Sequence, residues 1–160
     1  EDGIRDVAVT GVQTCALPIC YTIGNLDSPI TVYCEGLATG LTIYEAFAGQ
    51  ARVIVCFNAG NMVNVVKKTK GLTIVCADDD SQTEKEHGKN PGVEAARTAA
   101  NLHDCKLTIP ETLGSDINDE LSERLAYWST KELGNYKKGL DYVRKKALAD
   151  IKTTILKFTK

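Results

Sequence analysis

The chain has 160 residues and a formal net charge of −2, with 43% hydrophobic and 25% charged residues. This composition is ordinary for a soluble globular protein, and the length suits one domain with a real core. No apolar run approaches the roughly 20 residues that span a bilayer, and nothing resembles a secretory signal, so we expect a cytoplasmic location.

The cysteines, the histidines and the charges indicate which metal or nucleic-acid sites the chain could hold. The six cysteines form no CxxC pair and the two histidines are isolated, so a zinc site is poorly supported. Residues 120–160 hold ten Lys/Arg against five Asp/Glu, whereas residues 1–119 hold nine against sixteen. The acidic part favours a metal site, and the basic tail could contact nucleic acid or simply be a solvated helix surface.

The first nineteen residues, EDGIRDVAVTGVQTCALPI, differ from the rest of the chain. They show no sustained strand or helix period. They closely resemble the translation of a sequencing-library adapter, which is a contaminant at the edges of assembled genes. We therefore interpret residues 1–19 as non-native, leave Cys15 out of functional argument, and expect the chain to be a piece of a larger protein.

From residue 20 onward, strand-like and helix-like segments alternate. Short β-branched or apolar runs predict four strands at 31–34, 51–57, 72–77 and 105–109. Apolar residues at helical spacing, or an alanine-rich run, predict helices at 35–49, 59–68 and 92–102. Asn90 and Pro91 suit the N-cap and the first position of the last of these helices. The polar segments 78–90 and 110–119 are expected to be loops.

This alternation predicts an α/β fold. Strands separated by helices imply right-handed crossovers and a parallel sheet that is covered on both faces. We expect a compact sheet of about four strands with helices on both faces over residues 20–119. Residues 120–160 should form a helical extension with two apolar stripes that are separated at Gly134. Trp128 in the first stripe could be core or could stack on bases.

Polar side chains follow three of the predicted strands at their carboxyl ends, where open parallel sheets bind ligands. Glu35 follows the first strand, Asn58 the second, and Asp78 and Asp80 the third. Alternate residues of an extended segment point the same way, so these two aspartates could face one point while Asp79 faces away. Such oxygen ligands suit Mg²⁺ or Mn²⁺. The aspartates could instead form a solvated turn, but the glutamate at another strand end favours a metal site.

At these residues the sequence resembles the Toprim domain. The matching segments occur in the order and spacing of that family: YCEGLATGLTIYEA (33–46), FNAGN (57–61), TIVCADDD (73–80), NPGVEAA (90–96) and DIND (116–119). The version that they most resemble occurs in primases of plasmids and phages, where it is often fused to a helicase. The resemblance covers about residues 21–119 and implies a compact parallel-sheet fold for a catalytic domain within 20–119.

The resemblance also implies roles for individual residues. Glu35 would act as general acid/base and lie among the metal-binding acids, and Asp78 and Asp80 would hold Mg²⁺ (or Mn²⁺). In primases the metal would engage nucleotide phosphates and help to activate a 3′-hydroxyl. The implied function is Mg²⁺-dependent nucleotidyl transfer that makes primers from nucleoside triphosphates on single-stranded DNA, with a replicative helicase domain as a partner in the full-length protein.

Four further residues are candidates for accessory roles. Asp116 and Asp119 lie where primases of this group commonly have a DFND segment and could add a second acidic cluster near the metal. Asp119 could equally be a helix N-cap. Lys89 and Asn90 precede a helix N-terminus that favours phosphate, although a plain cap also explains them.

Three other kinds of function are alternatives to a primase. A Toprim nuclease would use the same acids, so the site alone does not separate the two enzymes. A non-catalytic module could use the basic tail to bind DNA or a replication partner. A phosphotransfer receiver or a phosphatase of the haloacid type, which both place aspartates at strand ends, fits poorly. The phosphatase needs a DxD after its first strand, and here that strand ends in Glu35. The chain has no GxxxxGKS/T loop and hence carries no helicase motor.

Overall fold

The computed structural model of the chain describes residues 19–132 and 139–158. The interpretation of residues 1–19, Cys15 included, and the predicted separation at Gly134 lie outside the described residues, apart from Ile19 at the boundary.

Five strands form one sheet in the order β1-β3-β2-β4-β5. The strands are β1 (Tyr21–Ile23), β2 (Ile30–Cys34), β3 (Arg52–Val55), β4 (Leu72–Cys76) and β5 (Lys106–Thr108). β2 is parallel to both β3 and β4, and β4 is parallel to β5, whereas β1 runs antiparallel to β3 at the edge. Val32 lies opposite Val53 on one side and Ile74 on the other, so the registers of the central strands place apolar side chains in one row.

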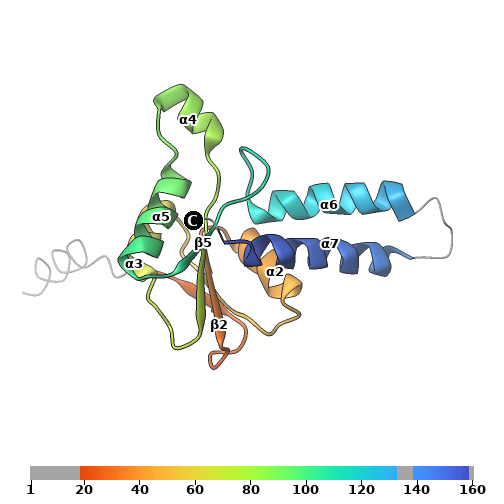
Figure 1. Cartoon of the computed structure of the whole chain (residues 1–160), viewed down its shortest axis with the longest axis horizontal. Coiled ribbons are helices and arrows are strands. Elements are labelled where there is room, and N and C mark those ends of the chain that lie inside the picture. Colours follow the sequence, from red (N-terminus) through yellow and green to blue (C-terminus); the bar gives the residue numbers. More distant parts are fainter. Residues whose placement is uncertain (1–18, 133–138, 159–160) are drawn as a thin grey trace, which may run out of the picture.

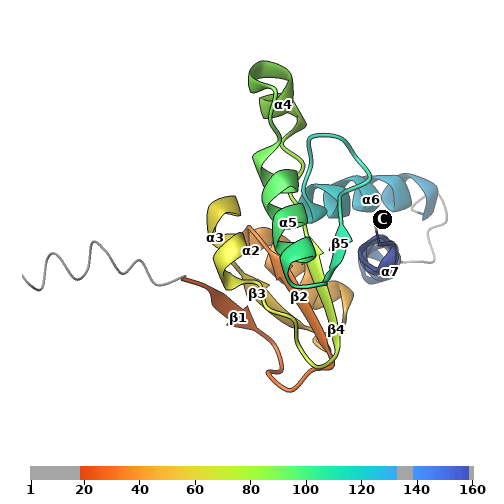
Figure 2. The ribbon, with the colours of Figure 1, turned by 60° about the vertical axis from the view of Figure 1, so that its left-hand side comes forward.

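Helices cover both faces of the sheet (Figure 1). They are α2 (Leu37–Ala46), α3 (Ala59–Val65), α4 (Ser81–His87), α5 (Pro91–Leu102), α6 (Ile117–Glu132) and α7 (Leu140–Leu156). α3 and α5 contact each other on one face, whereas α2, α6 and α7 lie together on the other (Figures 1 and 2). The three-layer α/β fold with a mostly parallel sheet is therefore confirmed.

Two apolar clusters fill the spaces between the sheet and its helices. Successive residues of β2 belong to different clusters, with Val32 and Cys34 in one and Tyr33 in the other, because neighbouring strand side chains point to opposite faces. The cluster under α2, α6 and α7 includes Ile43, Phe47, Ile117, Leu121, Ala147, Ile151 and Ile155. The cluster under α3 and α5 includes Met62, Val66, Ala96, Ala99 and Ala100.

Two elements were not predicted. β1 has only three residues, which is too short to show a period. α4 falls in the expected loop 78–90 and has no buried residue, so it lacks the apolar stripe on which the prediction relied. Its Gln, Glu and Lys residues are good helix formers, and Gly88 ends it at a φ of +70°, a conformation that glycine adopts without strain.

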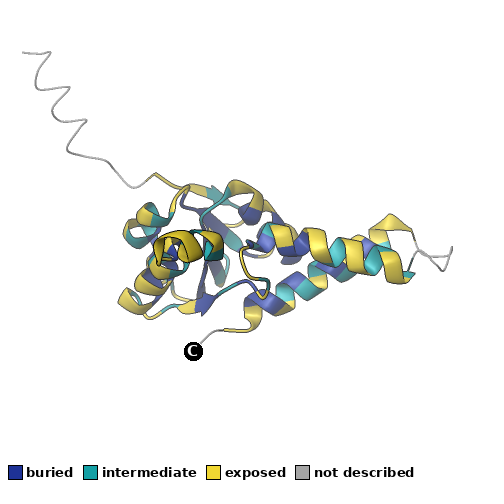
Figure 3. Cartoon of the chain, turned by 90° about the horizontal axis from the view of Figure 1, so that it is seen from above, coloured by how far each residue is buried: buried dark blue, intermediate teal, exposed yellow. Residues whose placement is uncertain are grey.

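The two C-terminal helices share the core of the sheet. Ile117 and Leu121 at the start of α6 are buried, and so are Ala147, Ile151 and Ile155 along α7. Figure 3 shows the pair extending to one side of the sheet. Trp128 is half-buried against the same cluster, and its Nε1 donates a hydrogen bond of 2.6 Å to Asp150 Oδ2. These contacts favour a packing role for Trp128 over base stacking.

Among the described residues, no helix is both long and apolar enough to cross a membrane.

The docking of α7 can be tested by truncating Ile151, whose side chain is fully buried. Changing Ile151 to Ala should lower the free energy of unfolding by about 2–4 kcal/mol, because the change removes buried methyl groups and leaves a cavity. The matched control is Leu140→Ala at the 73% exposed start of the same helix, where we expect a loss within about 0.5 kcal/mol. Equal losses in chemical denaturation would contradict this packing.

Candidate functional site

The predicted acids lie at the carboxyl ends of two adjacent central strands. Glu35 follows β2, and Asp78 and Asp80 follow β4. Tyr33 lies opposite Val75 in the parallel register, so the two strands end side by side. The chain passes from β2 to β3 on one side and then to β4 on the other side, which makes this edge the point where strand order reverses.

The electrostatics of Asp78 show that the acids are close to one another. Burial is the main cause that raises the pKa of Asp78 from 3.8 to about 7. The same pKa is raised further by four neighbouring carboxylates, those of Glu35, Asp116, Asp80 and Asp119. Burial also raises the pKa of Glu35, the charge of Asp80 adds to this effect, and the backbone N–H of Ala59 opposes it. The fold thus brings together acids from three separate segments.

Asp78 has an atom that lacks a partner. Its Oδ1 is buried, and no hydrogen-bond donor from the described residues reaches it. A buried acceptor without a donor is unfavourable, and more so when neighbouring carboxylates repel its charge. A cation bound at this oxygen would relieve both effects.

Asp80 is held by the start of α5. Its Oδ2 accepts a 2.9 Å hydrogen bond from the backbone N–H of Gly92, and its own N–H donates to Asn90 Oδ1 at 3.1 Å. A Cβ atom at position 92 would lie 2.3 Å from the carbonyl oxygen of Asp78, so only glycine permits this approach. One oxygen of Asp80 is therefore engaged by the protein itself.

Asp79 is a structural residue of the site. Consistent with the expectation that it faces away from its neighbours, its carboxylate is buried and accepts 2.6 Å and 2.9 Å hydrogen bonds from Asn90 Nδ2 and from the N–H of Gly114. Its own N–H donates to the carbonyl oxygen of Ser115 at 3.0 Å. Asp79 thereby ties the end of β4 both to the start of α5 and to the loop that precedes α6.

Asp116 and Asp119 form a reciprocal cap at the start of α6. Asp116 Oδ1 accepts a 2.8 Å hydrogen bond from the N–H of Asp119, and Asp119 Oδ2 accepts a 3.3 Å bond from the N–H of Asp116. α6 begins at Ile117, so Asp116, and not Asp119, stands at the N-cap. Both carboxylates also lie near Asp78, so capping and proximity to the acids coexist.

Two threonines of α2 were not identified from the sequence. Thr39 Oγ1 donates a 2.7 Å hydrogen bond to Asp116 Oδ2, and Thr42 Oγ1 bonds Asn118 Oδ1 at 2.9 Å. Both threonines are buried, and they lie on α2, the helix that follows Glu35. The two threonines on the buried side of a helix were a signal in the sequence for hydrogen bonds to another segment, because buried hydroxyl groups need partners.

The remaining candidates have local roles in the structure. Asn58 caps α3, with its Oδ1 accepting a 2.7 Å bond from the N–H of Asn61. Asn90 caps α5 through a 3.2 Å bond from the N–H of Val93. Lys89 is exposed beside it.

Next to Asn58, Phe57 adopts a φ of +67°, which is strained for a bulky side chain. The N–H of Phe57 donates a 2.9 Å bond to the carbonyl oxygen of Glu35 and so fixes the backbone of that residue.

The carboxylate oxygens of Asp78 and Asp80 meet the requirements of a divalent cation. Within the described part of the chain, no three His, Cys, Asp or Glu side chains converge as a ready-made metal cage. Mg²⁺ commonly takes only one or two carboxylates and completes its shell with water and phosphate oxygens. The unpartnered oxygen of Asp78, together with the free oxygen of Asp80, fits that mode of binding.

Comparison with known proteins gives two matches. The sequence pattern described as Toprim domain matches residues 30–126, from β2 into α6, and so includes all of the acids described above. The chain is also similar to the DNA primase TraC of Escherichia coli, with 33% identity over 99 residues. That similarity covers 56% of this chain but 7% of the primase, so the chain spans a small part of its relative's length. No solved structure matches the chain.

The raised pKa of Asp78 predicts how stability depends on pH. Between pH values of about 4 and about 7 the folded chain binds more protons than the unfolded chain, so the free energy of unfolding of the metal-free protein should fall as the pH rises. Asp78→Asn should remove much of this fall and stabilise the metal-free chain by ~1–3 kcal/mol above pH 7. Glu35, whose pKa is raised as well, contributes in the same direction.

Urea denaturation across this pH range measures the effect. An unchanged pH dependence in the Asp78→Asn variant would show that Asp78 does not carry it.

The structural role of Asp79 predicts a different result at the neighbouring position. Asp79→Asn should lower the free energy of unfolding by ~2 kcal/mol, because a buried charged acceptor of two hydrogen bonds is replaced by a group that can also donate. Asp141→Asn, an exposed aspartate on α7, is the control and should change stability little. Denaturation curves that agree for the two variants would rule out the anchoring role.

Proposed function

This chain belongs to the Toprim domain family, and we propose on that basis that it is the Toprim part of a DNA primase that carries out Mg²⁺-dependent nucleotidyl transfer. The single observation that carries the proposal is the buried, unpartnered Oδ1 of Asp78 within a group of carboxylates at the carboxyl edge of the sheet. That edge is where an open parallel sheet binds its ligands.

Asp78 and Asp80 would hold the metal, with Glu35 beside them. A bound Mg²⁺ (or Mn²⁺) would supply positive charge to the phosphate oxygens of a nucleotide, where negative charge develops during transfer. Within the described residues, no donor occupies Oδ1 of Asp78, and Asp80 has one oxygen bound by the N–H of Gly92 and the other without a hydrogen bond. This partial fixation would orient Asp80 before any ligand arrives.

Glu35 would act as the general acid/base. A group that moves a proton near neutral pH works best when its pKa lies closer to the working pH, and both burial and the charge of Asp80 raise the pKa of Glu35. The backbone at Glu35 is held by the N–H of Phe57. The carboxylate therefore projects from a fixed point at the end of β2, where it could take a proton from an attacking hydroxyl.

The cap of α6 would set the position of the second acidic cluster. Thr39 holds Asp116 through its hydroxyl, and Asp116 and Asp119 hold each other's backbone N–H. These bonds place two more negative charges near Asp78 without making them ligands of an ion in the present arrangement. We assign both residues a positioning role that strengthens the attraction of the edge for a cation.

The substrates follow from the proposed reaction. Nucleoside triphosphates would supply the phosphates for the metal, and single-stranded DNA would serve as template. In the full-length protein, a replicative helicase domain would be a partner. Because the chain spans 7% of the relative's length, template binding would also involve segments outside this chain.

Metal binding by the acids is the first test. Mn²⁺ titrated into the chain should broaden NMR signals around Asp78 and Asp80, and Asp78→Asn should weaken the binding at least ~10-fold, because an anionic oxygen ligand is lost. The matched control is Glu45→Gln, an exposed glutamate on α2 that is paired with Arg144 and lies outside the acidic group. Equal Mn²⁺ affinity in all three proteins would overturn the proposed metal site and would favour a non-catalytic binding module.

The reaction class is tested in an intact protein that carries this domain. Glu35→Gln should reduce primer synthesis ~10²–10⁴-fold without lowering the thermal unfolding midpoint, because Glu35 makes no ion pair within residues 19–132 and 139–158. A parallel assay measures nicking of a DNA duplex. Loss of nicking in place of primer synthesis would assign the acids to a nuclease, and a fully active variant would remove Glu35 from the mechanism.

A further inference from the structure

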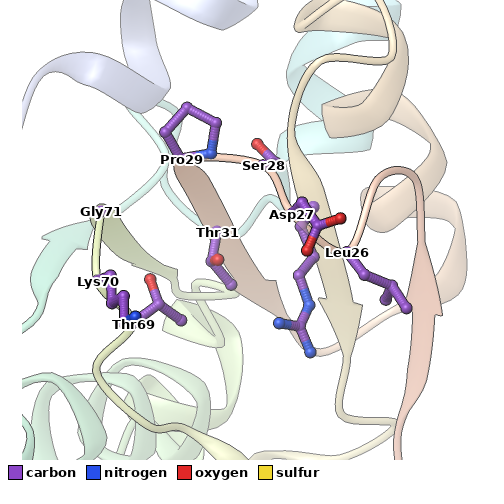
Figure 4. Close-up of a pocket in the computed structure, with 9 residues that line it drawn as sticks. Leu26, Asp27, Ser28, Pro29, Thr31, Thr69, Lys70 and Gly71 are labelled. Atoms are coloured by element: carbon purple, nitrogen blue, oxygen red, sulfur yellow. The ribbon is translucent and has the colours of Figure 1, made fainter.

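A cavity lies at the opposite end of the sheet from the acids. It has a volume of about 430 Å³ and is lined by the segments that lead into β2 and β4 and by the first residue of β3. We call this cavity, lined by residues 26–29, Thr31, Arg52 and 69–71, the amino-end pocket. Figure 4 shows Lys70 and Thr69 on one side of it, Leu26 and Asp27 on the other, and Thr31 of β2 between them.

The pocket holds a buried cationic donor without an acceptor. Arg52 lies opposite Thr31 in the parallel register. The residue is half-buried, and its Nε is a buried atom that has no hydrogen-bond partner in the part of the chain that the structure describes. The nearby hydroxyl of Tyr33 is occupied, since it donates a 3.1 Å bond to the carbonyl oxygen of Lys67 and accepts one from the N–H of that residue. A buried N–H of this kind is rare unless an ion or ligand completes it.

The charges in the pocket favour an anion. Arg52 and Lys70 both line it, and within residues 19–132 and 139–158 neither side chain has an ion pair. Asp27 is the one acid among the lining residues, so the two cations outnumber it and the lining carries a net positive charge. The hydroxyl of Ser28 is engaged with the backbone, since its oxygen accepts a 3.0 Å bond from the N–H of Ile30 and lies 2.6 Å from the carbonyl oxygen of Gln50.

The walls of the pocket are preformed. The N–H of Leu72 donates a 2.8 Å bond to the carbonyl oxygen of Pro29, which joins the loop before β4 to the loop before β2. A Cβ atom at Gly71 would lie 1.9 Å from that oxygen, so only glycine allows the two loops to meet. The backbone that carries Lys70 is therefore fixed in position, and a ligand would not have to order it.

We propose that the amino-end pocket binds a phosphate group between Arg52 and Lys70. A guanidinium offers a planar fork of donors, and an ammonium offers a point charge, which is a combination suited to phosphate. A tetrahedral phosphate can present oxygens to both walls at once, whereas a planar carboxylate presents its two oxygens to one side. The phosphate could belong to a free phosphorylated molecule or to a nucleic-acid backbone, because the chemistry at the two cations is the same.

Inorganic phosphate titrated into the metal-free full chain tests the site independently of the proposed catalytic edge. Backbone amide signals of Thr31 and Gly71 should shift, and Arg52→Gln and Lys70→Gln should each weaken binding ~10-fold or more, because each removes a charge-assisted bond. Asp27→Asn should tighten binding, because it removes the negative charge from the wall. Lys85→Gln, an exposed lysine on α4, is the matched control and should bind phosphate like the unchanged chain.

Three outcomes overturn the proposal. They are phosphate-induced shifts located elsewhere, phosphate affinity unchanged in both the Arg52→Gln and Lys70→Gln variants, and acetate binding as tightly as phosphate. Since Lys70 is exposed, its variant remains informative even if Arg52→Gln unfolds.

A second titration identifies the source of the phosphate. A nucleic-acid source predicts that a short single-stranded oligonucleotide shifts the same amides with an affinity that falls steeply with salt, and that Lys70→Gln reduces that salt dependence. A free phosphorylated ligand predicts that a nucleoside monophosphate shifts these amides and the oligonucleotide does not.

Discussion

In-register parallel pairing of β2 with β4 is the constraint on which the acidic edge depends. These strands are adjacent although β3 lies between them in sequence, because the chain crosses from one side of β2 to the other. Parallel neighbours end at the same edge, so Glu35 and Asp78 must lie close together once the strands pair. The apolar residues of both strands belong to clusters on both faces, which fixes the register, since a slip by one residue would exchange the two faces.

Hydrogen bonds around this edge hold carboxylates that repel one another close together. Asp79 is fully engaged with Asn90 and Gly114, so it anchors two segments and adds no free charge to the site. Thr39 and the reciprocal cap of α6 hold Asp116 from the other side. The cost of crowding the acids appears at Asp78, where burial and the neighbouring charges raise the pKa to about 7. A cation bound at this edge, as proposed above, would relieve this repulsion.

The two ends of the sheet carry opposite charge. Acids gather where β2 and β4 end, and Arg52 and Lys70 line the pocket where the strands begin. Both ends rely on a glycine at a close backbone approach, Gly92 beside Asp78 and Gly71 beside Pro29. The same parallel sheet thus positions two sets of charged groups, because all of its central strands start at one end and finish at the other.

The sequence alone determined the three-layer α/β fold, the four parallel strands and the grouping of Glu35, Asp78 and Asp80, because uniform apolar runs, helical spacing and strand-end acids are local signals. It did not reveal β1, which is too short, or α4, which has no buried face. Only the tertiary structure decided that Asp79 is an anchor, that Thr39 holds Asp116, and that the Nε of Arg52 is buried beside Thr31. These contacts join residues far apart in sequence, and such pairs are set by packing, which a local pattern does not encode.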